Sequence, residues 1–119
     1  MNLKDYNNES IIEEIKTEYM KDNIKQTDKN YLIITKNMRN NLANVKCDTI
    51  FIDCTYKIIP PGLKQYKFLV ILGFDDSRNK LILFLYSLIN HENKETFATI
   101  FDYLKLKYDF APKYVVTDF

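Results

Sequence analysis

The fold is decided by the stretch DTIFIDCTYKIIPP, residues 48–61. Residues 49–58 are rich in β-branched and aromatic side chains, which favours a β-strand, and the Pro-Pro-Gly that follows is typical of a turn. Asp53 stands in the middle of this apolar strand. Because a carboxylate among apolar side chains is costly to remove from water, we expect a group elsewhere in the chain to pair with Asp53.

Two more strands are predicted directly after this one, at residues 66–74 and 80–89. The polar sequence DDSRN between them suits a hairpin turn, in which we place Asp75 and Asp76. All three strands are apolar at successive positions. This pattern predicts a sheet that is covered by helices on both faces.

A helix and a fourth strand complete the predicted core. Apolar residues from Phe97 to Tyr108 recur at the i, i+3, i+4, i+7 spacing of an amphipathic helix, with Asn93 as its N-cap. The segment KYVVTDF, residues 113–119, begins a strand and brings a second aspartate, Asp118. A helical crossover of this length can place the fourth strand parallel to the first and beside it. We therefore predict an α/β fold with strand order 3-2-1-4.

This arrangement would bring Asp53 and Asp118 close together. Two neighbouring carboxylates repel each other unless a cation lies between them, and hard divalent ions such as Mg²⁺ or Mn²⁺ prefer oxygen ligands. A pair of such ions can activate the attacking oxygen and stabilise the leaving oxygen during phosphodiester cleavage. Two structural alternatives stay open, since Asp118 can be a loop or capping residue and Asp53 can accept backbone hydrogen bonds.

The first part of the chain predicts mainly helix. Ser10 and Glu13 have the capping-box spacing, and the apolar residues that follow them form one stripe, so we expect a helix over residues 8–26. A short strand at 30–35 and a further helix at 36–45, with Met38 and Leu42 on one side, are expected next.

Composition limits the class of protein. With 119 residues, 46% of them hydrophobic, the chain suffices for one domain with a modest core. A net charge of +1 argues against a polybasic nucleic-acid-binding mode, and two cysteines do not make a disulfide framework. The longest apolar run, residues 81–89, is too short to cross a bilayer as a helix. We expect an intracellular protein with no membrane segment.

Four segments taken together resemble the transposase domain of Mutator-like elements: FIDCTYKIIP, QYKFLVILGFDD, LYSLINHENKETFATIFDYLK and YVVTDF. The resemblance covers roughly residues 30–119. It implies a ribonuclease H-like fold and a DDE triad of acids that binds Mg²⁺ for DNA strand cleavage and transfer. By position, Asp53 matches the first acid and Asp118 the second. Cys54 stands where the family usually has glycine, and its small side chain should preserve the strand.

The resemblance also implies how the chain is divided into domains. The third acid of the family lies on a helix well downstream of the second, and no residue here can be assigned to it. We therefore expect residues 46–119 to be a partial catalytic domain without the fifth strand and C-terminal helices, preceded by a helical connector at 1–45. Such a fragment is expected to be inactive alone. The implied partners are transposon-end and target DNA, the implied location is the nucleus, and an exposed sheet edge would invite self-association.

Other interpretations stay open. A non-catalytic module that binds DNA or protein is the main alternative, and a nucleotide-binding domain is less favoured because a glycine-rich phosphate loop is missing from the sequence. Lys57, Lys64 and Lys67 near the first turn predict either a phosphate-contacting edge or ordinary solvated surface. His91 is expected to be a loop residue without a partner. Cys54 should point away from Asp53, because side chains alternate along a strand.

Overall fold

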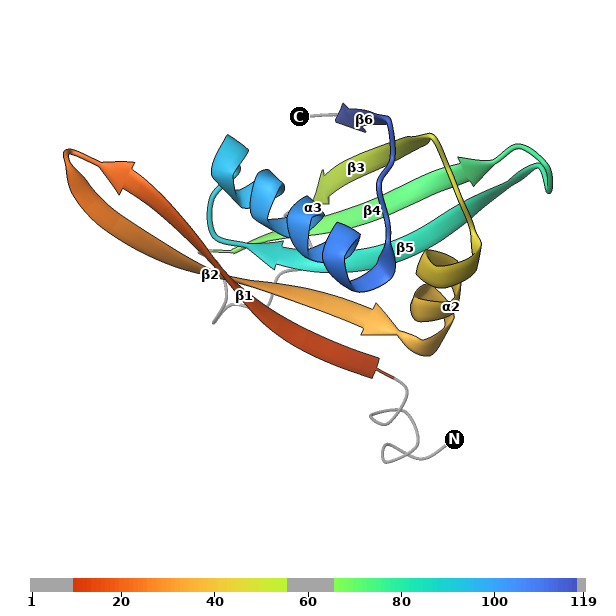
Figure 1. Cartoon of the computed structure of the whole chain (residues 1–119), viewed down its shortest axis with the longest axis horizontal. Coiled ribbons are helices and arrows are strands. Elements are labelled where there is room, and N and C mark those ends of the chain that lie inside the picture. Colours follow the sequence, from red (N-terminus) through yellow and green to blue (C-terminus); the bar gives the residue numbers. More distant parts are fainter. Residues whose placement is uncertain (1–9, 56–65, 118–119) are drawn as a thin grey trace.

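One mixed sheet organises the chain. The computed structural model describes residues 10–55 and 66–117, whose six strands are ordered β1-β2-β5-β4-β3-β6 (Figure 1). Neighbouring strands are antiparallel except for β3 and β6, which are parallel. The chain is therefore a mixed α/β protein, as predicted. The elements are β1 (Ser10–Lys21), β2 (Ile24–Thr35), α2 (Lys36–Asn44), β3 (Thr49–Thr55), β4 (Lys67–Asp75), β5 (Lys80–Ile89), α3 (Lys94–Tyr108) and β6 (Tyr114–Thr117).

The helix predicted over residues 8–26 is wrong. Residues 10–21 form β1, which pairs with β2 in a long antiparallel hairpin. Asp22 and Asn23 turn the chain with positive φ angles of 54° and 63°, the conformation that a two-residue hairpin loop requires. Glu13 makes no capping box and instead accepts a hydrogen bond from Lys107 on α3 at 3.0 Å. The division of the chain at residue 46 stays a prediction.

The helix predicted at residues 36–45 is confirmed as α2. Its N-cap is Thr35, whose hydroxyl accepts a hydrogen bond from the Met38 backbone N–H at 3.2 Å. Met38 and Leu42 are both buried, as their spacing predicted.

The elements after residue 48 also follow the prediction. β3, β4 and β5 are successive antiparallel strands, and α3 connects β5 to β6 on the far side of β3. Asn93 caps α3 by accepting a hydrogen bond from the Thr96 backbone N–H at 2.8 Å. At the other end, Asp109 adopts a left-handed conformation and its N–H bonds to carbonyls of the last turn. This C-cap turns the chain back toward the sheet, where β6 joins β3.

Helices cover only one face of the described sheet. α3 lies across that face in Figure 1, and α2 packs against the strands β2 and β5. Along β3, Ile50 and Ile52 are buried whereas Phe51 and Asp53 are exposed. The prediction of helices on both faces is therefore wrong for the described residues. The core consists of Ile15, Leu32, Ile34, Met38, Leu42, Val45, Ile50, Ile52, Leu69, Ile71, Ile82, Phe84, Leu85, Ile89, Ile100, Leu104 and Phe110.

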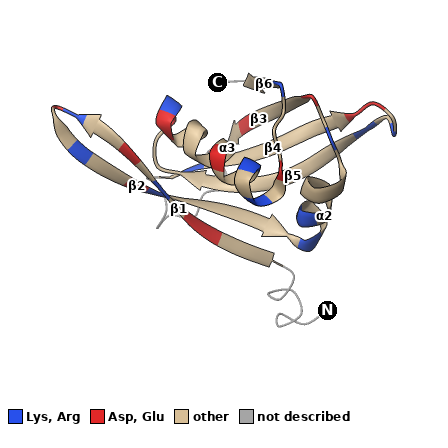
Figure 2. Cartoon of the chain, in the orientation of Figure 1, with Lys and Arg blue, Asp and Glu red and all other residues tan. Residues whose placement is uncertain are grey.

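Charged residues of both signs are spread over the hairpin, the helices and the turns (Figure 2). The middle of β4 and β5 carries none, because those strands read FLVILGF and LILFLYSLI. Across the ranges that the structure describes, no helix has the length and apolar character needed to span a membrane.

Candidate functional site

The candidate site lies where β3 and β6 run side by side. The carbonyl of Asp48, just before β3, accepts hydrogen bonds from the backbone N–H groups of Lys113 and Tyr114 at 2.8 and 2.9 Å. These two bonds fix the start of β6 against the start of β3. The parallel register then proceeds from Thr49 opposite Tyr114 to Ile52 opposite Thr117. The strands expected to be neighbours are therefore neighbours, with no strand between them.

Asp53 directly follows Ile52 and lies opposite Val70 of β4. Its side chain is exposed and shares a face with Phe51, away from the helices. The expectation of a buried carboxylate is therefore wrong. Asp53 is exposed, so its carboxylate does not need a partner to offset the cost of burial. Asp118 follows Thr117 in the sequence and lies outside the described residues. Only one of the two predicted ligands can thus be placed.

A second acid occurs at the carboxyl end of β3, but on the other face. Glu92 follows β5, and its carboxylate forms an ion pair with the Lys67 ammonium at 2.7 Å. Only 16% of the Glu92 side chain is exposed. The Cys54 thiol lies 3.7 Å from the same carboxylate oxygen. Cys54 therefore points to the helix-covered face, as strand alternation predicted. Sequence reasoning missed Glu92, since its contact depends on pairing between β3, β4 and β5.

Metal ligands do not cluster in the part of the chain that can be described. Residues 10–55 and 66–117 contain no group of three histidine, cysteine or acidic side chains placed to hold one ion. A site at Asp53 would thus need Asp118, substrate oxygens or water to complete its coordination.

His91 is not an isolated loop residue, and that prediction is corrected. Its Nδ1 lies 2.7 Å from a carboxylate oxygen of Asp28, and the Tyr19 hydroxyl is 3.5 Å from the other oxygen. Asp28 is buried, whereas 55% of the His91 side chain is exposed. The neighbouring buried Asn30 donates to Thr17 at 3.0 Å. This cluster joins the hairpin to the residues that follow β5. It could not be predicted from the sequence because residues 8–26 were expected to form a helix, which would not bring Tyr19, Asp28 and His91 together.

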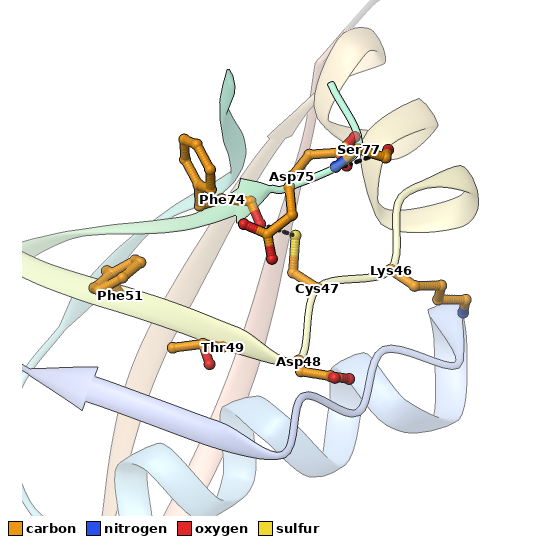
Figure 3. Close-up of a pocket in the computed structure, with 9 residues that line it drawn as sticks. Lys46, Cys47, Asp48, Thr49, Phe51, Phe74, Asp75 and Ser77 are labelled. Carbon is orange, nitrogen blue, oxygen red and sulfur yellow. Dashed lines mark hydrogen bonds between the residues drawn. The ribbon is translucent and has the colours of Figure 1, made fainter. Parts of the chain in front are cut away.

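A groove of about 590 Å³ opens at the opposite end of β3 (Figure 3). The Cys47 thiol in it donates to the Phe74 carbonyl at 3.4 Å. Burial, followed by the charges of Asp75, Asp76 and Asp48, raises the pKa of Cys47, so the thiol is a poor nucleophile and a poor metal ligand.

Asp75, which lies near Cys47, has a structural role. Asp75 accepts hydrogen bonds from the hydroxyl and the backbone N–H of Ser77 at 2.7 and 3.1 Å. The hydroxyl bond is the main reason why the pKa of Asp75 is lowered. Asp76 lies in the β4–β5 turn, as predicted, whereas Asp75 is the last residue of β4 and pairs with Lys80. We assign no chemistry to this groove.

The predicted lysine cluster can be placed only in part. Lys67 forms the ion pair with Glu92 described above, so its ammonium group is already paired with a carboxylate of the protein. Lys57 and Lys64 lie outside the described residues. A phosphate-contacting edge at this turn stays a prediction.

Comparisons with known proteins give no relative for this geometry. The chain matches no protein-family model, no curated protein and no solved structure.

Proposed function

We propose that this chain is part of a ribonuclease H-like domain of the DDE transposase type, in which Asp53 and Asp118 together bind Mg²⁺ or Mn²⁺. One observation carries the proposal. The last described pair of the parallel register is Ile52 and Thr117, and each of these residues is followed in the sequence by one of the two aspartates.

The chemistry follows from that register. Paired residues on adjacent strands point to the same face, so extending the register by one position would put both carboxylates on the face that carries Phe51. Two carboxylates at paired positions of adjacent strands repel each other, and a hard cation between them offsets the repulsion. The exposure of Asp53 leaves room for a phosphate group as a further ligand. A divalent ion held there would polarise a phosphodiester and activate the attacking oxygen.

Part of the strand arrangement supports the proposal. Among the described strands, β5, β4, β3 and β6 lie in the predicted order 3-2-1-4, and β6 is parallel to β3 after the crossover through α3. The β1–β2 hairpin, which extends the sheet beyond β5, was not predicted from the Mutator-like resemblance. Because the resemblance assigns two acids of its triad to this chain and leaves the third unassigned, we expect metal binding without strand transfer by this chain alone. The proposed nucleic-acid partner is DNA.

A non-catalytic module that binds DNA or protein is the second candidate. It is favoured by the exposure of Asp53 and by the missing third ligand among residues 10–55 and 66–117. In that case the aspartates would make only local hydrogen bonds, and divalent ions would bind no more tightly than they do to any acidic surface.

Metal titration separates the two candidates. At a Mg²⁺ or Mn²⁺ concentration ten times the dissociation constant, a single site stabilises the folded chain by about 1.4 kcal/mol. For a domain of this size, that gain raises the melting temperature by about 4–8 °C. Asp53→Asn and Asp118→Asn should each abolish the rise. Without metal, Asp53→Asn should not lower the melting temperature, because it removes a repulsion.

Asp48→Asn is the matched control. Asp48 is also an exposed aspartate, but it lies at the other end of β3, so its variant should keep the metal-induced rise. A parent chain that shows no rise, or a rise that persists unchanged in Asp53→Asn, would reject the metal site and favour the binding module. Fluorescence anisotropy with labelled duplex DNA, with and without Mg²⁺, then shows whether that module binds DNA.

A further inference from the structure

The outer edge of β1 is a long row of backbone groups with no strand beside it in the part of the chain that the structure describes. β1 pairs with β2 along its whole length, and no described strand lies on its other side (Figure 1). At the other margin of the sheet, β6 has only 4 residues, whereas β1 has 12. A long open edge is a template for pairing with a further strand.

The hairpin loop shows which backbone groups of β1 point outward. Lys21 and Ile24 flank the two-residue loop, so they form the hydrogen-bonded pair that closes the turn. Hydrogen-bonded and non-hydrogen-bonded pairs alternate along an antiparallel ladder. The odd-numbered residues of β1 are therefore bonded to β2, whereas the even-numbered residues from 10 to 20 direct their N–H and C=O groups to the open edge.

One lysine at this edge lacks a counter-charge. Lys16 is exposed and lies directly opposite Lys29 of β2, and like charges at opposed positions of a sheet repel each other. Lys29 has an acid within reach, because its ammonium group is 4.0 Å from the Glu14 carboxylate. Lys16 forms no ion pair with a described residue. A carboxylate placed beside Lys16 from outside the sheet would offset this repulsion.

Two copies of β1 can supply that carboxylate to each other. In an antiparallel pair with a two-fold axis at Ile15, Glu14 of each copy lies opposite Lys16 of the other, and residues 10–20 are all paired. An axis one residue away in either direction would put identical charges opposite each other. An axis further along the strand, at Thr17, pairs a shorter length of β1. Charge and pairing length therefore favour the axis at Ile15.

We propose that the protein forms a homodimer in which the β1 strands of two copies pair antiparallel about a two-fold axis at Ile15. The two sheets become one continuous sheet, in which the outward N–H and C=O groups of both β1 strands are bonded. Two reciprocal ion pairs between Glu14 and Lys16 fix the register.

The dimer is independent of the other inferences about this chain. β1 lies at one margin of the sheet, whereas β3 and β6 lie at the other, so the dimer does not rest on the proposed metal site. Residues 8–26 were expected to form a helix, so the sequence did not predict self-association through this edge.

Charge reversal tests the register on the whole chain. Sedimentation velocity over micromolar to submillimolar concentrations should give twice the chain mass for the parent. Glu14→Lys places a lysine opposite Lys16 of the other copy at both contacts and should weaken association by about tenfold or more. The double variant Glu14→Lys/Lys16→Glu restores opposite charges across the axis and should dimerise like the parent.

Asp102→Lys is the matched control. It makes the same change of charge at an exposed position of α3 and should dimerise like the parent. Circular dichroism checks that each variant is folded. Amide hydrogen exchange of the parent needs no substitution: the even-numbered residues from 12 to 18 should exchange more slowly as the protein concentration rises. The odd-numbered residues between them are already bonded to β2 and should change little.

Several results would overturn the inference. These are a parent that stays monomeric, a folded Glu14→Lys variant that dimerises like the parent, and a double variant that does not recover dimerisation. Equal weakening by Asp102→Lys would also overturn it, since net charge rather than register would then control association. A parent dimer whose even-numbered β1 amides exchange as fast as in the monomer would overturn it as well. If Glu14→Lys does not fold, the double variant and the exchange measurement still decide the outcome.

Discussion

Gly73→Ala should destabilise the protein, although replacing a strand glycine by alanine usually stabilises. Gly73 lies in β4 opposite Ile50, and its φ angle is not positive, so alanine fits its backbone. An added Cβ would lie 2.6 Å from Cε2 of Phe84 and 3.0 Å from Sγ of Cys47. Non-bonded carbons prefer about 3.5–4.0 Å, so the ring of Phe84 would have to retreat by about 1 Å.

The surroundings do not allow that retreat. Phe84 is fully buried, and its ring centroid lies 4.9 Å from that of Phe110. Overpacking in a core costs about 1–3 kcal/mol, and the reduced entropy of the unfolded chain returns about 0.4–1 kcal/mol. We expect a net loss of about 1–2 kcal/mol, seen as a fall in melting temperature of about 4–8 °C. Phe110 leads into β6, so hydrogen exchange of the Tyr114–Thr117 amides should quicken as well.

A double-mutant cycle checks the cause. Phe84→Leu removes the atoms that clash, so Gly73→Ala should cost much less in its presence, with a coupling of about 1 kcal/mol or more. Thermal and urea unfolding of the parent, the two single variants and the double variant give this coupling. If Gly73→Ala is neutral or stabilising, or if the two effects simply add, the packing described for the helix-covered face is incorrect.

Three further predictions concern buried polar groups and pH. Asn30→Ala should lower the free energy of unfolding by about 2–3 kcal/mol, measured by urea titration, because it leaves the buried Thr17 hydroxyl and the Asn90 backbone N–H without their bonds to Asn30. Tyr108→Phe should raise the free energy of unfolding by about 1 kcal/mol, since the buried Tyr108 hydroxyl has no hydrogen-bond partner among the described residues. Burial raises the pKa of Tyr108, and hydrogen bonds with Tyr103 and then Glu13 raise the pKa of Lys107. Folding therefore favours the protonated form of both groups. Their contribution to the free energy of unfolding is fully present below their ordinary pKa values near 10, and it should decrease as the pH rises above those values. The decrease should be smaller in Tyr108→Phe.

The described strands and the helix after residue 48 could be predicted from the sequence. The polar turn after Asp75 and the Asn93 cap are local signals, and local backbone chemistry acts wherever the chain lies. The turn predicted at Pro-Pro-Gly, residues 60–62, lies outside the described residues. A helix of this length between two strands also allows the next strand to run parallel to an earlier one, which is why β6 was expected beside β3.

Tertiary structure decided the features that local patterns leave open. Ile11, Ile15 and Tyr19 fit one stripe of a helix and also one face of a strand, so only the pairing of β1 with β2 settles which occurs. The exposure of Asp53 depends on which sheet face the helices cover, and the His91–Asp28 contact depends on how the hairpin joins β5. Burial is a property of contacts between segments that are distant in the chain, and the apolar strands alone did not show that α2 and α3 would lie on the same face of the described sheet.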